Sequence, residues 1–115
     1  EMICRVNKLR RSEGKKDIAL DSRLMTAAQK HSEAQLEHKQ MTHEGFTPET
    51  KSFSDRFKLE NFPITGGGEN CAAGQKTVEQ VMQSWINSPG HHANLVSDCG
   101  CFGFGRAGDY WTQAF

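Results

Sequence analysis

The chain of 115 residues lacks any long hydrophobic stretch. No apolar run approaches the roughly 20 residues that a membrane-spanning helix needs, so we expect no transmembrane segment. The first four residues, Glu1–Cys4, do not have the composition of a signal peptide. We therefore expect a mature or trimmed domain from which any targeting segment has already been removed.

An excess of charge of either sign is also missing. The chain has 14 Lys and Arg against 14 Asp and Glu, so its net charge is zero with neutral histidines. A generic polyanion binder needs a basic excess, so we expect no nucleic-acid partner. Five basic residues do cluster near the start, and we expect them to form a solvated helix face: Lys8, Arg10, Arg11, Lys15 and Lys16.

Several short motifs of catalysis are absent. The sequence contains no G-x-S-x-G nucleophile elbow and no H-E-x-x-H metalloprotease helix. It has no C-x-x-C pair either, which argues against a structural zinc site built from cysteines. Any chemistry has to be assembled from residues that are far apart in the chain.

Cysteine is present in an even number. The four are Cys4, Cys71, Cys99 and Cys101. In a secreted protein they would form two disulfides, with three possible connectivities, and a strained Cys99–Cys101 link is one option. In a cytosolic protein they would be free or bind metal.

Helical patterns cover much of the chain, and we expect helices over residues 2–13, 21–39, 52–59 and 77–86. Pro89 and Gly90 should stop the last helix and reverse the chain. Alternating residues then predict a hairpin over 102–115, and extended segments are expected near Ile18 and Glu69. This order indicates one α+β domain spanning residues 1–115, with helices layered on a small sheet.

The inner face expected for helix 21–39 is rich in alanine and therefore has small side chains. Its stripe is Leu24, Ala27, Ala28, His31, Gln35 and Leu36. Such a stripe requires a close neighbour, and we expect His31 to be a core histidine with its hydrogen bonds satisfied.

Three residues are candidates for a joint site. Glu69 follows Gly66–Gly68, so its carboxylate is open to ligands or to backbone donors. His43 lies just past a predicted helix end, and His91 follows Pro89-Gly90 and should turn inward. Two histidines and a glutamate can bind zinc and leave a fourth position open. The alternatives are structural: Glu69 would hold the loop at Asn70, and His43 would be a surface or capping residue.

Taken in order, the motifs resemble those of one family across essentially the whole chain. It is similar to the CAP superfamily of cysteine-rich secretory, antigen 5 and pathogenesis-related 1 proteins, in its short bacterial and fungal SCP-like branch. The matching segments are Val6–Arg10, Leu24–Ser32, Thr42-His43, Gly68-Glu69-Asn70, the run Trp85–Asn94 that resembles W-x-N-S-P-G-H-x-x-N, and Tyr110–Phe115.

The resemblance implies a three-layer α-β-α sandwich, secretion, disulfides and a central cleft that can hold a divalent metal such as zinc. His43 and Glu69 match the first histidine and the G-E-N glutamate of longer members. Ser88 and Tyr110 replace the second glutamate and the second histidine, and His91 compensates, which leaves a three-residue site. Cys4 and Cys71 point within the family to a fungus or other eukaryotic microbe.

Functions implied by the resemblance fall into three classes. The first is binding of a sterol or other small lipid, in a defence, virulence or cell-surface role, with an apolar lining of Phe46, Phe53, Phe57 and Phe62. These side chains would equally serve as core. The second is a zinc-dependent hydrolase in which His43 and His91 hold the zinc and Glu69 is the base. The third is an effector that acts through a protein partner.

Overall fold

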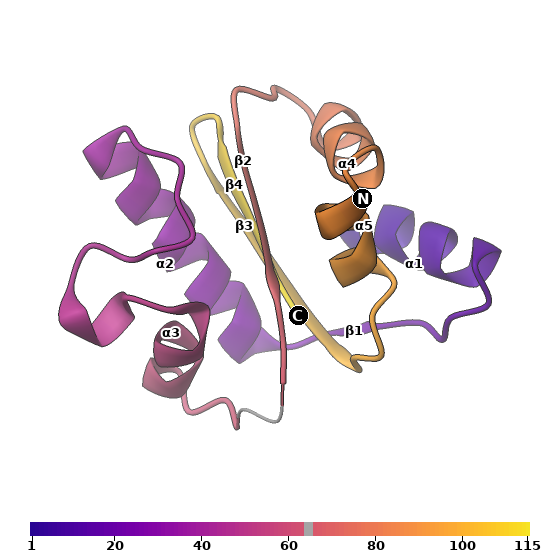
Figure 1. Cartoon of the computed structure of the whole chain (residues 1–115), viewed down its shortest axis with the longest axis horizontal. Coiled ribbons are helices and arrows are strands. Elements are labelled where there is room, and N and C mark those ends of the chain that lie inside the picture. The colour runs from indigo at the N-terminus through magenta and orange to yellow at the C-terminus, as the bar shows by residue number, and fades with distance from the viewer. Residues whose placement is uncertain (64–65) are drawn as a thin grey trace.

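The computed structural model describes residues 1–63 and 66–115 (Figure 1). Within those residues the chain forms five α-helices, one short 3-10 helix and four strands, which confirms the α+β class. The helices are α1 (Met2–Ser12), α2 (Ser22–His38), α3 (Phe53–Leu59), α4 (Val78–Ile86) and α5 (Pro89–Leu95), with the 3-10 turn at Pro48–Thr50. The strands are β1 (Ala19–Leu20), β2 (Glu69–Ala73), β3 (Cys101–Ala107) and β4 (Tyr110–Ala114).

The four strands form one mixed sheet in the order β1-β3-β4-β2. The short β1 runs parallel to β3, and β3 and β4 form the expected antiparallel hairpin. β2 pairs antiparallel with β4, so that Glu69 lies opposite Ala114 and Cys71 lies opposite Thr112. In this order β2 is an edge strand, and it carries Glu69 at its first position.

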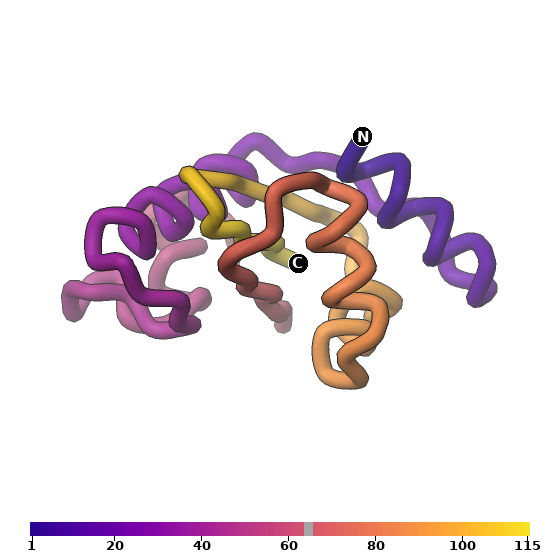
Figure 2. The backbone as a smooth tube through the Cα atoms, turned by 90° about the horizontal axis from the view of Figure 1, so that it is seen from above, coloured from indigo at the N-terminus to yellow at the C-terminus, as the bar shows by residue number. Residues whose placement is uncertain are grey.

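Helices cover both faces of the sheet, which confirms the three-layer sandwich. Figures 1 and 2 show α2 and α3 on one side and α1, α4 and α5 on the other. Each face has its own buried cluster. Met2, Val6, Val81, Trp85 and Leu95 belong to the first cluster, and Leu24, Ala27, Ala28 and Phe57 belong to the second.

Helix α2 packs very closely on β3, as its alanine-rich stripe requires. A Cβ at Gly103 would lie 2.2 Å from the carbonyl carbon of Leu24, and one at Gly105 would lie 2.4 Å from the Cα of Gln29. Real Cβ atoms essentially never approach backbone atoms so closely. Glycine on the strand and alanine on the helix therefore set the spacing of this layer.

Side-chain caps account for the starts of α2 and α4. Asp21 accepts hydrogen bonds from the backbone N–H groups of Arg23 and Leu24, and Thr77 accepts one from that of Gln80. The expectation at Pro89 was wrong in part: α4 does end before it, but Pro89 also begins α5. Proline fits the first position of a helix because that N–H has no partner within the helix.

The basic cluster near the start is not uniformly solvated, which corrects the expectation for Arg10. Its side chain is buried, and Nε donates to the carbonyl of Lys16. Nη1 donates to the carbonyls of Leu95 and Ser97, and Nη2 to that of Cys99. Arg10 thus ties α1 to the segment after α5.

All four cysteines are free, so the expected disulfides are not formed in this structure. Cys4 is exposed on α1, whereas Cys71 is buried on β2. Cys99 packs against the first core cluster and Cys101 against the second. The side chains of Cys99 and Cys101 therefore pack on opposite faces of the sheet.

The helices described are too short or too polar to cross a bilayer.

Candidate functional site

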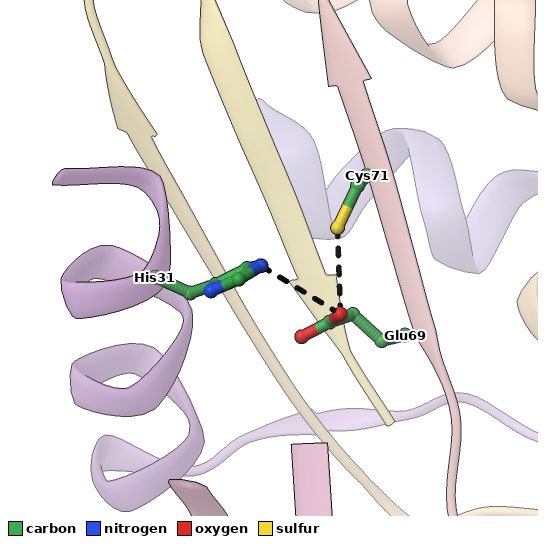
Figure 3. Close-up of side chains that lie close together, drawn as sticks. All are labelled: His31, Glu69 and Cys71. Atoms are coloured by element: carbon green, nitrogen blue, oxygen red, sulfur yellow. Dashed lines mark hydrogen bonds and ion pairs between the residues drawn. The ribbon is translucent and has the colours of Figure 1, made fainter. Parts of the chain in front are cut away.

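Strand β2 directs two side chains toward α2. Successive residues of a strand point to opposite faces, so Glu69 and Cys71 share one face and Asn70 takes the other. Figure 3 shows both side chains directed toward His31 on α2. On the opposite face, Asn70 Nδ2 donates to the backbone carbonyl of His91 and to Gln113 Oε1.

Glu69 is the centre of a group of polar side chains. The Nη2 of Arg56 donates to its Oε2 at 2.5 Å, and the Nδ1 of His43 lies 3.1 Å from its Oε1. The Nε2 of His31 lies 3.9 Å from Oε1, and the Sγ of Cys71 lies 3.4 Å from the same oxygen. We call these five residues the Glu69 cluster. They come from α2, the loop after it, α3 and β2.

The inner stripe of α2 positions His43 through its neighbour Thr42. Gln35 Oε1 accepts a hydrogen bond from the backbone N–H of Thr42, and the Nε2 of His31 donates to the carbonyl of Thr42 at 2.7 Å. The loop is therefore held at both backbone groups of one residue. His43 follows at the rim, with 55% of its side chain exposed.

The cluster favours an ionised Glu69. Burial is the largest influence and raises the pKa of its carboxyl, but His43, Arg56 and His31 together outweigh it and leave the pKa below its ordinary value. The hydrogen bond to Glu69 raises the pKa of His43 despite partial burial. The contact thus favours the protonated form of His43 and the ionised form of Glu69.

Burial disfavours the charged forms of the two deeper residues. Burial lowers the pKa of His31, and because its Nε2 faces a carbonyl, the proton is on Nε2. His31 is core, as expected, but its buried Nδ1 has no hydrogen-bond partner among the described residues, so it is not fully satisfied. Burial, and then the nearby Glu69 carboxylate, raise the pKa of the Cys71 thiol far above its usual range.

His91, the third expected site residue, does not contact Glu69. Its Nδ1 lies 2.9 Å from the hydroxyl of Ser88, and burial followed by the charge of His43 lowers its pKa. The structure therefore brings His43 and Glu69 together directly. It places His91 on α5, across the edge strand from them.

The four phenylalanines expected to line a lipid site occupy different places. Phe57 is buried, and the rings of Phe53 and Phe62 pack against it at 5.5 and 5.9 Å. Phe46 stacks on His38 at 3.9 Å. Phe62 also lines a pocket of about 440 Å³ together with Phe115 and Arg23.

The donor atoms on Glu69 and its neighbours are of types that could hold a zinc ion. His43 Nδ1, Glu69 Oε1 and Cys71 Sγ are 3.1, 3.4 and 3.7 Å from one another. The donor atoms of His31, Glu69 and Cys71 also lie within 4.8 Å of each other. Imidazole, carboxylate and thiolate are the ligand types that zinc takes. Arg56 occupies only Oε2, which leaves Oε1 directed toward the other donors.

Sequence reasoning missed Arg56, His31 and Cys71 as members of this group. Arg56 lies three residues after Phe53 and one before Phe57, which places it on the inward stripe of α3. Cys71 lies two residues after Glu69, which is the spacing of one strand face. The spacings of Arg56 and Cys71 are visible in the sequence. Their roles could be assigned only by knowing what the inward side of α3 and this face of β2 pack against.

Comparisons with known proteins agree with this architecture. Residues 4–115 match the CAP family, described as the cysteine-rich secretory protein family. The uncharacterized protein YkwD of Bacillus subtilis (strain 168) is 31% identical over 112 residues, which cover 95% of this chain and 43% of YkwD. The chain thus spans less than half of that relative.

Solved structures share the fold. An extracellular protein containing an SCP domain from Bacillus anthracis str. Ames superposes with a TM-score of 0.94 at 25% identity, over 99% of this chain and 38% of that one. An outer surface protein from Borrelia burgdorferi has a TM-score of 0.84 at 19% identity, over 98% of this chain and 85% of that one. These relatives are bacterial and give no support to an origin in a eukaryotic microbe.

Proposed function

This chain belongs to the cysteine-rich secretory protein (CAP) family, and on that basis we propose that it is a divalent-metal-binding domain of an extracellular protein. The observation that carries the proposal is the contact between His43 and Glu69. A histidine nitrogen and a carboxylate oxygen lie 3.1 Å apart at the rim of the sandwich. They come from segments 26 residues apart, brought together by the fold.

The setting of this pair supports binding. Arg56 holds Oε2 of Glu69, so the carboxylate cannot rotate freely and Oε1 faces His43. Hydrogen bonds of this kind, made to a metal ligand by residues behind it, orient the ligand and tune its basicity. The exposed side chain of His43 places one member of the pair at the surface. The guanidinium charge opposes a bound cation, so we expect moderate affinity.

An extracellular location is supported by the names of two relatives. The B. anthracis protein is described as extracellular, and the Borrelia protein as an outer surface protein. Since this chain covers 38% of the former, any activity of a whole protein would also depend on other segments.

Lipid binding is the second candidate, and the pocket beside Phe62 favours it. Its volume of about 440 Å³ lies within the range of roughly 300–1,000 Å³ that small ligands occupy. Phe53 and Phe57 contribute to core packing instead. Binding of labelled cholesterol or a fatty acid at micromolar ligand, lost on Phe62→Ala, would support this candidate.

Hydrolysis receives less support from the geometry. A general base needs a free oxygen within reach of a water molecule. In Glu69, Oε2 is bound by Arg56, the carboxylate is buried, and Oε1 would be a ligand of the proposed metal. We therefore assign Glu69 to binding.

The test is calorimetric titration of the metal-free protein with Zn²⁺. We expect one saturable site in the wild type and at least about tenfold weaker binding in His43→Ala. His43 is the informative position because its exposed side chain can be removed without emptying the core. His38→Ala is the matched control, since His38 is an exposed histidine on α2 that stacks on Phe46. Equal affinity in His43→Ala and wild type would refute the proposal.

A further inference from the structure

We propose that Cys71 is a thiolate ligand of this metal site, so that the site selects zinc and other thiophilic metals over magnesium, calcium and manganese. The proposal rests on the proposed function, because it adds a third donor to the His43–Glu69 pair. What carries it is the position of one sulfur atom. Cys71 Sγ lies 3.7 Å from His43 Nδ1 and 3.4 Å from Glu69 Oε1.

The fold holds this sulfur close to the pair. Cys71 is two residues beyond Glu69 on β2, so both side chains point toward α2 (Figure 3). Pairing with Thr112 on β4 fixes the register, and the side chain is buried. Its thiol is free. The strand pairing thus fixes the backbone at Cys71, and only rotation of its side chain moves the sulfur.

The three donor atoms are spaced like neighbours in a tetrahedral zinc site. Zinc bonds of about 2.0–2.1 Å to nitrogen, 2.0–2.2 Å to oxygen and 2.3 Å to sulfur separate adjacent ligand atoms by roughly 3.3–3.6 Å. The observed separations are 3.1 Å, 3.4 Å and 3.7 Å. Small side-chain rotations would bring all three to the required spacing.

Other histidines are less suited to be the third donor. The Nε2 of His31 already donates to the carbonyl of Thr42 at 2.7 Å, and that bond holds the loop before His43. The Nδ1 of His91 is paired with the hydroxyl of Ser88. Cys71 has a weaker competing contact: its nearest atoms outside the pair include the Thr42 carbonyl oxygen at 3.7 Å.

Thiolate coordination determines the class of metal. Magnesium and calcium are bound almost entirely by oxygen, whereas soft thiolate ligands favour zinc and copper(I). A set of one nitrogen, one oxygen and one sulfur leaves a fourth position for water or a further ligand.

The experiment uses Co²⁺ as a spectroscopic substitute for zinc. Serine replaces Cys4, Cys99 and Cys101, so that Cys71 is the sole thiol, and this variant is titrated with Co²⁺. We expect a thiolate-to-cobalt charge-transfer band in the near ultraviolet together with visible tetrahedral bands. Cys71→Ser and Cys71→Ala in the same background should lose the charge-transfer band. They should also bind Zn²⁺ at least about 10–100-fold more weakly.

The outcomes distinguish the Cys71 thiolate proposal from the proposal of a metal site at His43 and Glu69. Cobalt that binds without a charge-transfer band, with the same affinity after Cys71→Ser, overturns the thiolate ligand while leaving the His43–Glu69 site intact. No cobalt or zinc binding in a variant that circular dichroism shows to be folded overturns both. A charge-transfer band that survives His43→Ala at unchanged affinity also counts against the arrangement.

Discussion

The side-chain amide of Asn94 on α5 donates to the side-chain oxygen of Asn70 on β2 at 2.9 Å, and also to the backbone carbonyl of Glu69 at 3.2 Å. This bond joins the G-E-N segment to the end of the S-P-G-H-x-x-N run. It also explains Gly68, because a Cβ there would lie 2.8 Å from the Asn94 side chain. The Asn94 side chain thus anchors the strand that carries Glu69.

Asn94→Ala is expected to lower the free energy of unfolding by about 1–3 kcal/mol. The change leaves the fully buried side-chain oxygen of Asn70 without its donor, and an unsatisfied buried group costs about that much. Urea denaturation measures the effect. Asn87→Ala is the control, because Asn87 is exposed at the end of α4. Its substitution should change the free energy of unfolding by less than about 0.5 kcal/mol. Equal effects of the two substitutions would show that the bond contributes nothing.

Glycine at positions 103 and 105 should be irreplaceable. Gly103→Ala or Gly105→Ala would push α2 away from β3, and we expect a loss at or above the upper end of the roughly 1–3 kcal/mol that overpacking costs. Gly90→Ala is the matched control, since its Cβ would meet nothing within 4 Å and it lies in α5. Thermal unfolding should show a lower midpoint for the first two variants and an unchanged or slightly higher one for the control.

Much of the fold follows from local patterns in the chain. Helices α2 and α4 have apolar periodicity and side-chain caps at Asp21 and Thr77, and the β3–β4 hairpin has alternation around a Gly108-containing turn. Helix α5 was missed because a proline can either end one helix or begin the next. The residues around Pro89 do both, and only packing of Leu95 into the core decides the second role.

The site was less predictable than the fold. His43 and Glu69 could be named from residue type and motif resemblance, and the structure brings them together. Arg56 and Cys71 could not be assigned, because their roles depend on α3 and β2 packing against the same side of α2. Such pairings are set by tertiary contacts between distant segments, which no local pattern records.

Arg10→Met should be strongly destabilising although the substitution keeps most of the side-chain volume. It removes the donors to the carbonyls of Lys16, Leu95 and Ser97. Leu95 is the last residue of α5, and Ser97 follows that helix. We expect a loss of about 3 kcal/mol in the free energy of unfolding, since buried carbonyls lose their partners. Arg11→Met provides the comparison, because Arg11 pairs with Asp17 at the surface and such pairs contribute about 0–1 kcal/mol. A similar small effect at both positions would contradict the structural role of Arg10.

All four thiols should be titratable without reduction. The structure has no disulfide among Cys4, Cys71, Cys99 and Cys101. In denaturant, a thiol reagent should therefore detect four groups in protein that was never exposed to reductant. In the native state Cys4 should react rapidly and Cys71 slowly, because one is exposed and the other buried. Detection of two thiols or none before reduction would restore the disulfide prediction.

His92 should make stability depend on pH near neutrality. Its Nδ1 faces the carbonyl of Ile86 at 3.0 Å and its Nε2 faces Glu13 at 2.6 Å, so the doubly protonated ring satisfies both acceptors. The bond to Ile86, followed by Glu13, raises the pKa of His92 above its ordinary value. The stabilisation is thus complete below the unfolded pKa of about 6.5 and is lost as pH rises through the folded pKa.

His92→Gln tests this relation, and we expect it to be less stable than wild type at pH 6 by less than about 1 kcal/mol, since the pair is partly exposed. The difference should shrink toward pH 8.5, as the wild-type imidazole loses its proton. Glu13→Gln should reduce the same pH dependence without abolishing it, because the carbonyl of Ile86 remains. Urea denaturation at several pH values gives the comparison. A difference between His92→Gln and wild type that grows with pH would contradict the assigned protonation, since it would mean that the neutral ring is the stabilising form.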